Sequence, residues 1–195
     1  MRHTAGYTIR SYGKGRTIAH LGLQKVLKGL FALLPFLCAS CDDSIHSSVP
    51  DTVVNFTCSL QQSPYSFITT PGQFLSVIKD GSSYIVQVPG QSPYRDGKTG
   101  VYLGFGGLII GYPAISLEVN SQYVAYDQAC PVEAEDLNIA RLSINLNREG
   151  TCSRCGTVYD LDTGFPKSGI GKERLKTYKV YADKTALGTT LVVKN

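Results

Sequence analysis

From residue 52 onward, the chain alternates short apolar stretches with polar turns. The stretches are rich in Val, Ile, Tyr, Phe and Thr, and in several of them apolar and polar residues alternate, which is typical of half-buried β-strands. Turn signals such as Asp80-Gly81 fall between them. The pattern therefore predicts an all-β protein, an antiparallel sandwich or barrel formed by one domain, 52–195. The stretches are 52–60, 73–78, 83–88, 100–105, 123–127, 141–146, 177–183 and 189–194.

The first part of the chain has a different pattern. Lysines precede an apolar run, "GLFALLPFLCAS" (29–40), which ends in small residues directly before Cys41. The run is shorter than the roughly 20 apolar residues that a membrane-spanning helix needs. It resembles the export signal of a bacterial lipoprotein, which is cleaved before a cysteine that then carries lipid. We therefore predict a signal segment at 1–41, lipidation of Cys41 and a polar tether at 42–51. The alternative is a buried helix that ends at a cysteine by chance.

The same two parts of the chain also differ in charge. Before Cys41 there are six Lys or Arg and no Asp or Glu, which leaves 13 basic against 15 acidic residues for the remainder. The basic character belongs to the leader, so the domain gives no electrostatic argument for binding nucleic acid. An acylated Cys41 would bind the protein to a membrane, because each CH₂ group of an acyl chain that is buried in the bilayer contributes about 0.8 kcal/mol to the free energy of binding. The predicted location is the cell envelope, anchored to a bacterial membrane and facing the periplasm or the cell surface.

The positions of the histidines exclude several classes of enzyme. His3, His20 and His46 are the three in the chain, so none follows residue 46. The domain has no Ser-His-Asp or Cys-His pair for nucleophilic catalysis and no histidine ligand for zinc. We predict that the protein is not an enzyme. The Gly-rich stretch 104–112 leads into another strand pattern, so it predicts a close backbone approach rather than a phosphate loop.

Three cysteines are the candidate metal-binding residues of the domain. Cys152 and Cys155 form a Cys-x-x-Cys motif, and Cys130 lies before them in the sequence Cys-Pro-x-Glu. Such spacing is typical of a thiolate metal site, which usually takes four ligands. Glu133 stands where a zinc knuckle would have its fourth ligand, so one hypothesis is a zinc site of three sulfurs and one oxygen.

The order of the segments around these cysteines resembles that of a Rieske iron–sulfur domain. In that family a strand leads into Cys-x-His, and a later Cys-x-x-His-Gly is followed by an aromatic residue, a glycine-containing loop and a closing strand. Gly156 and Tyr159 match the second motif. The resemblance covers 123–180, about a third of the chain, and implies a Rieske-like fold with a small cysteine-bearing ligand-loop subdomain. It is carried by "YVAYDQACPV" (123–132), "CSRCGTVYDLDTG" (152–164) and "SGIGKERLKTYKV" (168–180).

Carrying the family's ligands over residue by residue gives an incomplete set. Cys130 and Cys152 fall on the two cysteine ligands of one iron, whereas the two histidines of the other iron would fall on Val132 and Cys155. Three interpretations stay open. The cysteines hold a modified 2Fe-2S cluster with one further group, or they hold zinc with Glu133, or the site is free of metal and Cys130 pairs with Cys152 in a disulfide.

The resemblance and the altered ligands together predict the function. The protein is expected to be a lipid-anchored envelope protein whose Rieske-like iron–sulfur site is degenerate or altered, serving as a non-enzymatic binding or structural module. The alternative is an iron–sulfur protein that transfers electrons through a modified 2Fe-2S centre. A redox or structural protein of the envelope would be its partner in either case. An oxygenase ferredoxin is less consistent with export and with the missing histidines.

Overall fold

The computed structural model describes residues 47–97, 100–115 and 122–195. The predicted signal segment 1–41, its lipidation site Cys41 and the first part of the tether therefore lie outside the described residues. The chain divides into two compact units, Met1–Ser44 and Ile45–Asn195, and all described residues belong to the second. In the described ranges, none of the helices is both long and apolar enough to cross a membrane.

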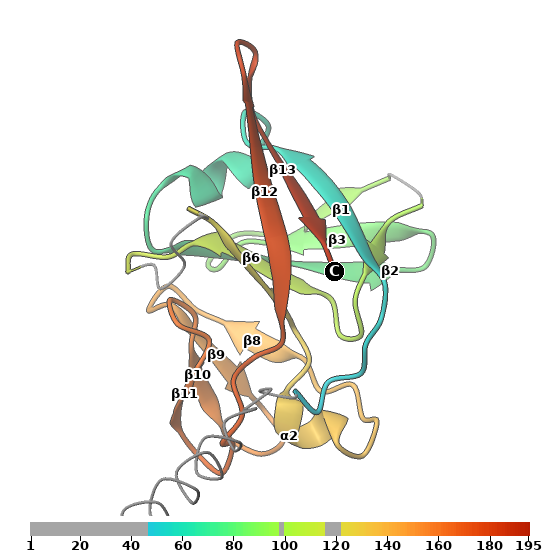
Figure 1. The fold of residues 1–195 in the computed structure, drawn as a ribbon, viewed down its shortest axis with the longest axis vertical. Coiled ribbons are helices and arrows are strands. Elements are labelled where there is room, and N and C mark those ends of the chain that lie inside the picture. The colour runs from blue at the N-terminus through green and yellow to red at the C-terminus, as the bar shows by residue number, and fades with distance from the viewer. Residues whose placement is uncertain (1–46, 98–99, 116–121) are drawn as a thin grey trace, which may run out of the picture. The chain divides into compact units, whose positions relative to one another are not determined.

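Nine strands of the described residues form one antiparallel sheet, which is drawn in Figure 1. The 3-10 helix η2 (Tyr65–Thr69) connects its first two strands in sequence. In Figure 1, strands β12, β13 and β1 lie across β2 and β3, so the sheet folds over on itself. In spatial order the sheet contains β4 (Tyr94–Asp96), β3 (Ser83–Gln87), β2 (Gln73–Asp80), β6 (Leu108–Tyr112), β7 (Val124–Asp127), β12 (Thr177–Thr185), β13 (Gly188–Lys194), β1 (Val54–Ser59) and β5 (Tyr102–Leu103).

The alternation that predicted strands in the sequence is visible in β1. Val54, Phe56 and Cys58 are buried while the residues between them are exposed, because successive side chains of a strand point to opposite faces. Phe56 pairs with Val193 of β13, and both pack in the core that the folded sheet encloses. Burying a side chain of this kind stabilises the fold by roughly 1.5–3 kcal/mol.

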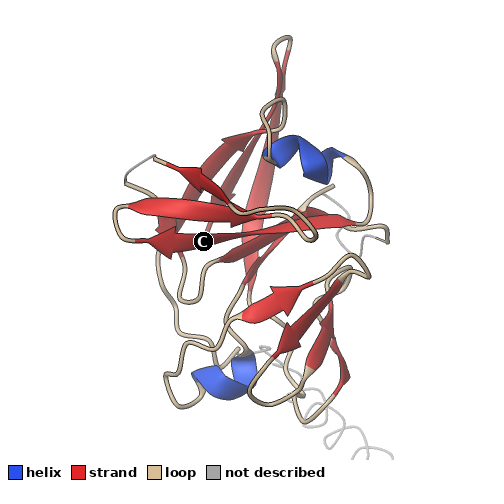
Figure 2. Cartoon of the chain, turned by 180° about the vertical axis from the view of Figure 1, so that it is seen from behind, coloured by secondary structure: helices blue, strands red, loops and turns tan. Residues whose placement is uncertain are grey.

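A second, smaller antiparallel sheet is inserted between β7 and β12 (Figure 1). A one-turn helix, α2 (Pro131–Ala134), precedes it. Figure 2 shows that strands make up both sheets and that helix is confined to short segments of the described chain. The predicted all-β, antiparallel fold with a small cysteine-bearing subdomain is thereby confirmed. In spatial order the small sheet contains β11 (Pro166–Ser168), β10 (Val158–Asp160), β9 (Glu149–Cys152) and β8 (Leu142–Ile144).

The two sheets share a second hydrophobic core. Phe74 of β2, Ile109 of β6 and Tyr126 of β7 contribute to it from the large sheet, and Leu142 and Leu161 from the small subdomain. Residues adjacent to these in the large sheet, such as Leu75 and Ile110, face the first core instead. The central strands are thus buried on both faces, which explains why their sequences read as continuous apolar runs.

The Gly-rich stretch 104–112 makes the close backbone approach that the sequence predicted. A Cβ at Gly106 would collide with the backbone of Ala129, and one at Gly111 would collide with the ring of Phe74. Ala129 directly precedes Cys130, so Gly106 allows the loop before β6 to pack directly against the first cysteine.

The second part of the predicted tether, residues 47–51, packs against the domain. Ser48 donates hydrogen bonds from its backbone N–H and its hydroxyl to the carboxylate of Glu173, both at 2.8 Å. Val49 is 2% exposed and packs with Ala129 and Ala134, on either side of the first cysteine loop. The ammonium group of Lys176 donates to the carbonyl oxygen of Val49 at 3.1 Å. Residues 47–51 therefore form part of the support of the candidate site.

Candidate metal centre

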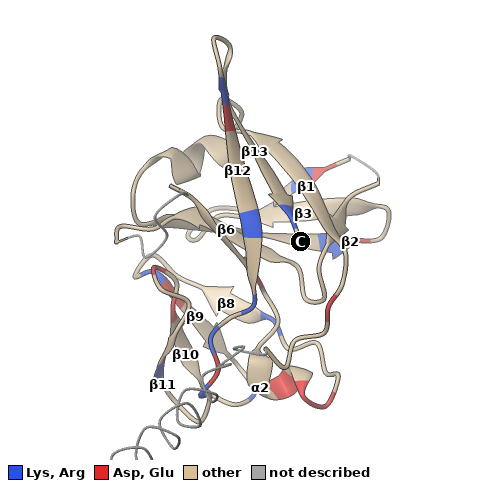
Figure 3. Ribbon diagram, in the orientation of Figure 1, with Lys and Arg blue, Asp and Glu red and all other residues tan. Residues whose placement is uncertain are grey.

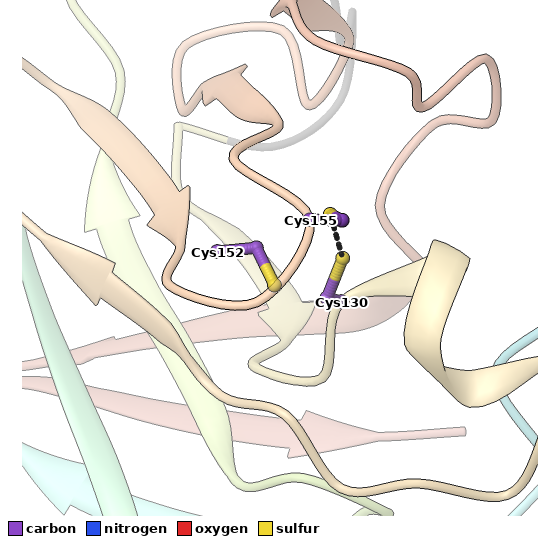
Figure 4. Close-up of side chains that lie close together, drawn as sticks. All are labelled: Cys130, Cys152 and Cys155. Carbon is purple, nitrogen blue, oxygen red and sulfur yellow. Dashed lines mark hydrogen bonds between the residues drawn. The ribbon is translucent and has the colours of Figure 1, made fainter.

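The structure brings the three predicted cysteines together at one end of the small sheet. Cys130 follows β7 and caps the start of α2, Cys152 ends β9, and Cys155 lies in the turn between β9 and β10. Their Sγ atoms all lie within 4.8 Å of one another, and those of Cys130 and Cys155 are 3.6 Å apart (Figure 4). Cys130 and Cys152 are fully buried, whereas Cys155 is partly exposed. The domain is therefore Rieske-like in this respect: two cysteine loops converge at the tip of a small β-subdomain.

Backbone hydrogen bonds fix the loop that carries Cys152 and Cys155. The N–H of Cys152 donates to the carbonyl of Thr157, and the N–H of Gly156 donates to the carbonyl of Cys152, both at 3.0 Å. Gly156 has φ of 71°, a left-handed conformation that glycine adopts without strain. The Thr157 hydroxyl oxygen accepts hydrogen bonds from the thiol of Cys155, at 3.2 Å, and from the N–H of Gly171, at 3.1 Å. Thr157 thus ties the second cysteine loop to the loop before β12.

Asp127 fixes the loop that carries Cys130. Its buried carboxylate accepts hydrogen bonds from the N–H groups of Phe105, Gly106 and Ala129 at 2.7, 2.9 and 2.8 Å, and from the hydroxyl of Tyr178 at 2.7 Å. A carboxylate that accepts several such bonds is strongly stabilised where it is buried. The sequence reasoning missed this residue; its signal is an acidic residue that ends an apolar strand just before the first cysteine.

The thiols of Cys130 and Cys155 differ in how readily they lose a proton. Burial raises the pKa of Cys130 to about 12, and the neighbouring sulfurs of Cys152 and Cys155 add to the rise, against a backbone hydrogen bond from Glu133. Burial acts in the same direction on Cys155, but hydrogen bonds with the side chain and backbone of Thr157 and with the other two cysteines outweigh it and lower its pKa. Of these two thiols, that of Cys155 loses its proton more readily.

Glu133 does not join the three sulfurs. Within the described residues, the group of metal-binding side chains contains the cysteines and no carboxylate. One oxygen of Glu133 instead lies 3.6 Å from the guanidinium group of Arg154. Figure 3 shows acidic residues on α2 and on the loop that follows it. The hypothesis of Glu133 as a fourth ligand therefore has no support from the observed geometry.

The disulfide that the sequence suggested is not formed in this structure. Cys130, Cys152 and Cys155 are all free thiols. Their mutual distances place each sulfur close to both others. A Cys130–Cys152 disulfide therefore stays a prediction for the oxidised protein, and Cys155 is an equally near partner for Cys130.

The residues at this site do not fit a conventional Rieske centre. Such a centre takes two imidazoles on its second iron, and the sequence after His46 contains no histidine. Val132 stands at one of the two positions, where its partly buried side chain packs against the second core. A valine has no ligand atom, and Cys155 supplies a thiolate in place of a neutral nitrogen. The site is a compact set of three thiols.

Comparisons with known proteins yield solved structures of low sequence identity. No family model and no curated protein matches the chain. One similar solved structure is the ferredoxin of carbazole 1,9a-dioxygenase from Nocardioides aromaticivorans, with a TM-score of 0.34 and 18% identity over 73% of this chain and 97% of that chain. Another is described as the small subunit of an NADH-dependent nitrite reductase from Mycobacterium tuberculosis, with a TM-score of 0.31 and 14% identity over 74% of this chain and 98% of that chain.

Proposed function

We propose that this chain is a lipid-anchored protein of the bacterial cell envelope and that its Rieske-like domain carries an altered metal site. Of the usual ligand types, cysteine and histidine, this site has cysteine only. In this proposal the domain is a non-enzymatic binding or structural module. The observation that supports it most is the convergence of three sulfurs within 4.8 Å in a domain whose sequence has no histidine after residue 46.

A structural role follows from where the sulfurs lie. Cys130 belongs to the loop between the two sheets, while Cys152 and Cys155 belong to the small sheet. An ion held by all three would join the two cysteine loops within the second core. Because metal binding to thiolates is coupled to folding, the ion would stabilise the small subdomain selectively.

The alternative function is electron transfer through a modified 2Fe-2S centre. The partial exposure of Cys155 favours it, since a ligand close to the surface gives a redox partner of the envelope a short path to the metal. This candidate needs inorganic sulfide and a fourth ligand in addition to the three thiolates. The two functions therefore require metal sites of different composition, which chemical analysis can distinguish.

The test is the composition of the full chain purified from membranes without oxygen. The proposal predicts bound metal, no stoichiometric acid-labile sulfide and no reducible iron–sulfur signal in EPR spectra. Cys152→Ser should lose the metal, whereas Cys58→Ala should retain it, because Cys58 is buried in the other core. Iron and sulfide in equal amounts, with a reducible EPR signal, would establish the electron carrier instead.

The anchor is tested separately from the metal. Cys41→Ser should release the protein from membranes into the soluble fraction, because lipid attachment requires the cysteine thiol. Membrane association that persists in this variant contradicts the lipoprotein proposal and leaves the metal site unaffected.

A further inference from the structure

The spacing of the sulfurs fits one ion better than a pair of irons. Ligands of a tetrahedral zinc ion with bonds of about 2.3 Å lie about 3.8 Å apart. The sulfurs of Cys130 and Cys155 are 3.6 Å apart, and all three lie within 4.8 Å of one another. Each sulfur needs to move by less than about 1 Å to reach tetrahedral positions around a common ion. Ligands of two different irons in a cluster are separated by the irons themselves and cannot lie so close together.

A buried phenol stands beside the Cys130 sulfur without a hydrogen bond of good geometry. Tyr159 is 0% exposed, and its hydroxyl oxygen has no hydrogen bond among the described residues. Its ring packs in the same core as Cys130 and Cys152. Buried hydroxyl groups are almost always paired, so an unpaired one at a group of thiols calls for a ligand.

The loop before β12 packs against this phenol. A Cβ built on Gly171 would lie 2.8 Å from the Tyr159 hydroxyl oxygen and 2.8 Å from a methyl carbon of Thr157, the residue that contacts Cys155. A side chain at position 171 would therefore crowd both Tyr159 and Thr157. A surface pocket lies next to these loops and is lined in part by Val132 and Gly171.

A bound dication favours the deprotonated form of a phenol that coordinates it, because a metal is the largest charge in its own site. Binding then releases protons from the thiols and from the phenol to solvent.

We infer that Cys130, Cys152 and Cys155 bind a single zinc-class divalent ion and that the phenol oxygen of Tyr159 is its fourth ligand. The inference rests on the proposed function, because it concerns the same site, and it adds the nuclearity, the class of ion and a ligand of a different chemistry. Three thiolates select a soft ion of this class over the hard cations Mg²⁺ and Ca²⁺.

Cobalt(II) is a suitable probe, since it replaces zinc in tetrahedral sites and reports its ligands in visible spectra. The full chain, reduced and stripped of metal, is titrated with Co²⁺ alone. We expect one equivalent to bind with tetrahedral d–d bands and a thiolate-to-cobalt charge-transfer band. Tyr159→Phe should keep the charge-transfer band but shift the d–d bands and weaken binding by at least about tenfold. The matched control is Tyr126→Phe, a fully buried tyrosine of the same core, which should behave as the unaltered protein.

A second measurement uses the unaltered protein and zinc itself. Addition of Zn²⁺ to the unaltered protein should produce the ultraviolet difference signal of tyrosinate, which is also expected in Tyr126→Phe and absent in Tyr159→Phe. Identical cobalt spectra and affinities for the unaltered protein and Tyr159→Phe, or a zinc titration without tyrosinate, overturn the fourth ligand. Two irons with sulfide in the anaerobically purified protein overturn the single ion. Failure to retain or bind any metal contradicts the proposed function itself.

Discussion

The two sheets of this domain are held together by different means. The large sheet has strands of up to nine residues, paired over long registers and enclosing an apolar core. The strands of the small sheet are three or four residues long, and its loops depend on polar contacts and on the cysteines. A sheet this short buries little apolar surface of its own. Small subdomains of this kind commonly need a metal or a disulfide for stability, so the difference points to the three cysteines as that support.

The sharpest way to test this contrast is to remove apolar side chains from each sheet. Phe56→Ala should cost about 4 kcal/mol in the free energy of unfolding, because it leaves a cavity in the large core, and the loss should be the same with and without a metal chelator. Leu161→Ala in the second core should cost about 3 kcal/mol, and bound metal should offset part of that loss. Urea unfolding measures both. Thr57→Ala, an exposed neighbour of Phe56, is the control and should stay close to the unaltered protein.

Asp127 tests the polar support of the first cysteine loop. Asp127→Asn keeps the size of the side chain but weakens its bonds to the N–H groups of Phe105, Gly106 and Ala129. Hydrogen bonds to a charged group contribute about 1.5–3 kcal/mol each, so we expect a loss of about 3 kcal/mol and weaker metal binding. Asp183→Ala, on the exposed part of β12, should change neither quantity. Unchanged metal affinity in Asp127→Asn would show that the loop keeps its position without this carboxylate.

The docked segment 47–51 should have a smaller effect. Val49→Ala removes a side chain that packs behind Cys130, and Glu173→Gln weakens the hydrogen bonds from Ser48. Each change is expected to cost about 1 kcal/mol. Hydrogen exchange should become faster in α2 and around Cys130, while the strands of the large sheet stay protected. Faster exchange throughout the large sheet would contradict a local role.

The ion pair between Glu149 of β9 and Lys167 of β11 should have the smallest effect. Lys167 lowers the pKa of Glu149, and Asn145 contributes through a hydrogen bond. A carboxyl group with a lowered pKa in the folded state contributes stability above its ordinary pKa, and this contribution is lost as the pH falls through the folded pKa. Glu149→Gln should therefore be slightly less stable than the unaltered protein at pH 7 and equal to it in acid. A difference that grows as the pH falls would have the wrong sign.

The sequence predicted the large sheet well and the small one only in part. Alternation along 52–60 located β1, and the apolar runs 73–78 and 123–127 located strands that are buried on both faces. Strands β9 to β11 have no such signal, because they are short and their side chains serve turns, ion pairs and cysteine positions. These strands were predicted only because the cysteine segments resemble the metal-binding segments of a known family.

The candidate site was predicted in composition but not in its contacts. The motif spacing groups Cys130, Cys152 and Cys155, and the structure brings them together. Glu133 stays a predicted fourth ligand by spacing, and in the structure its carboxylate lies near Arg154. The contacts of Asp127 with Gly106 and of Thr157 with Gly171 join segments that are far apart in the chain. No local pattern encodes such contacts, so they could only be found in three dimensions.

The central claim is that these three cysteines hold one metal ion within the small subdomain. Native mass spectrometry of the full chain, purified without oxygen, tests it most directly by weighing what the folded protein carries. The claim predicts the mass of the reduced chain plus one ion, less the protons released on binding, and a return to the reduced mass after chelation. A chain that carries two irons and two sulfides, or one that carries no metal and has lost two protons to a disulfide, would contradict it.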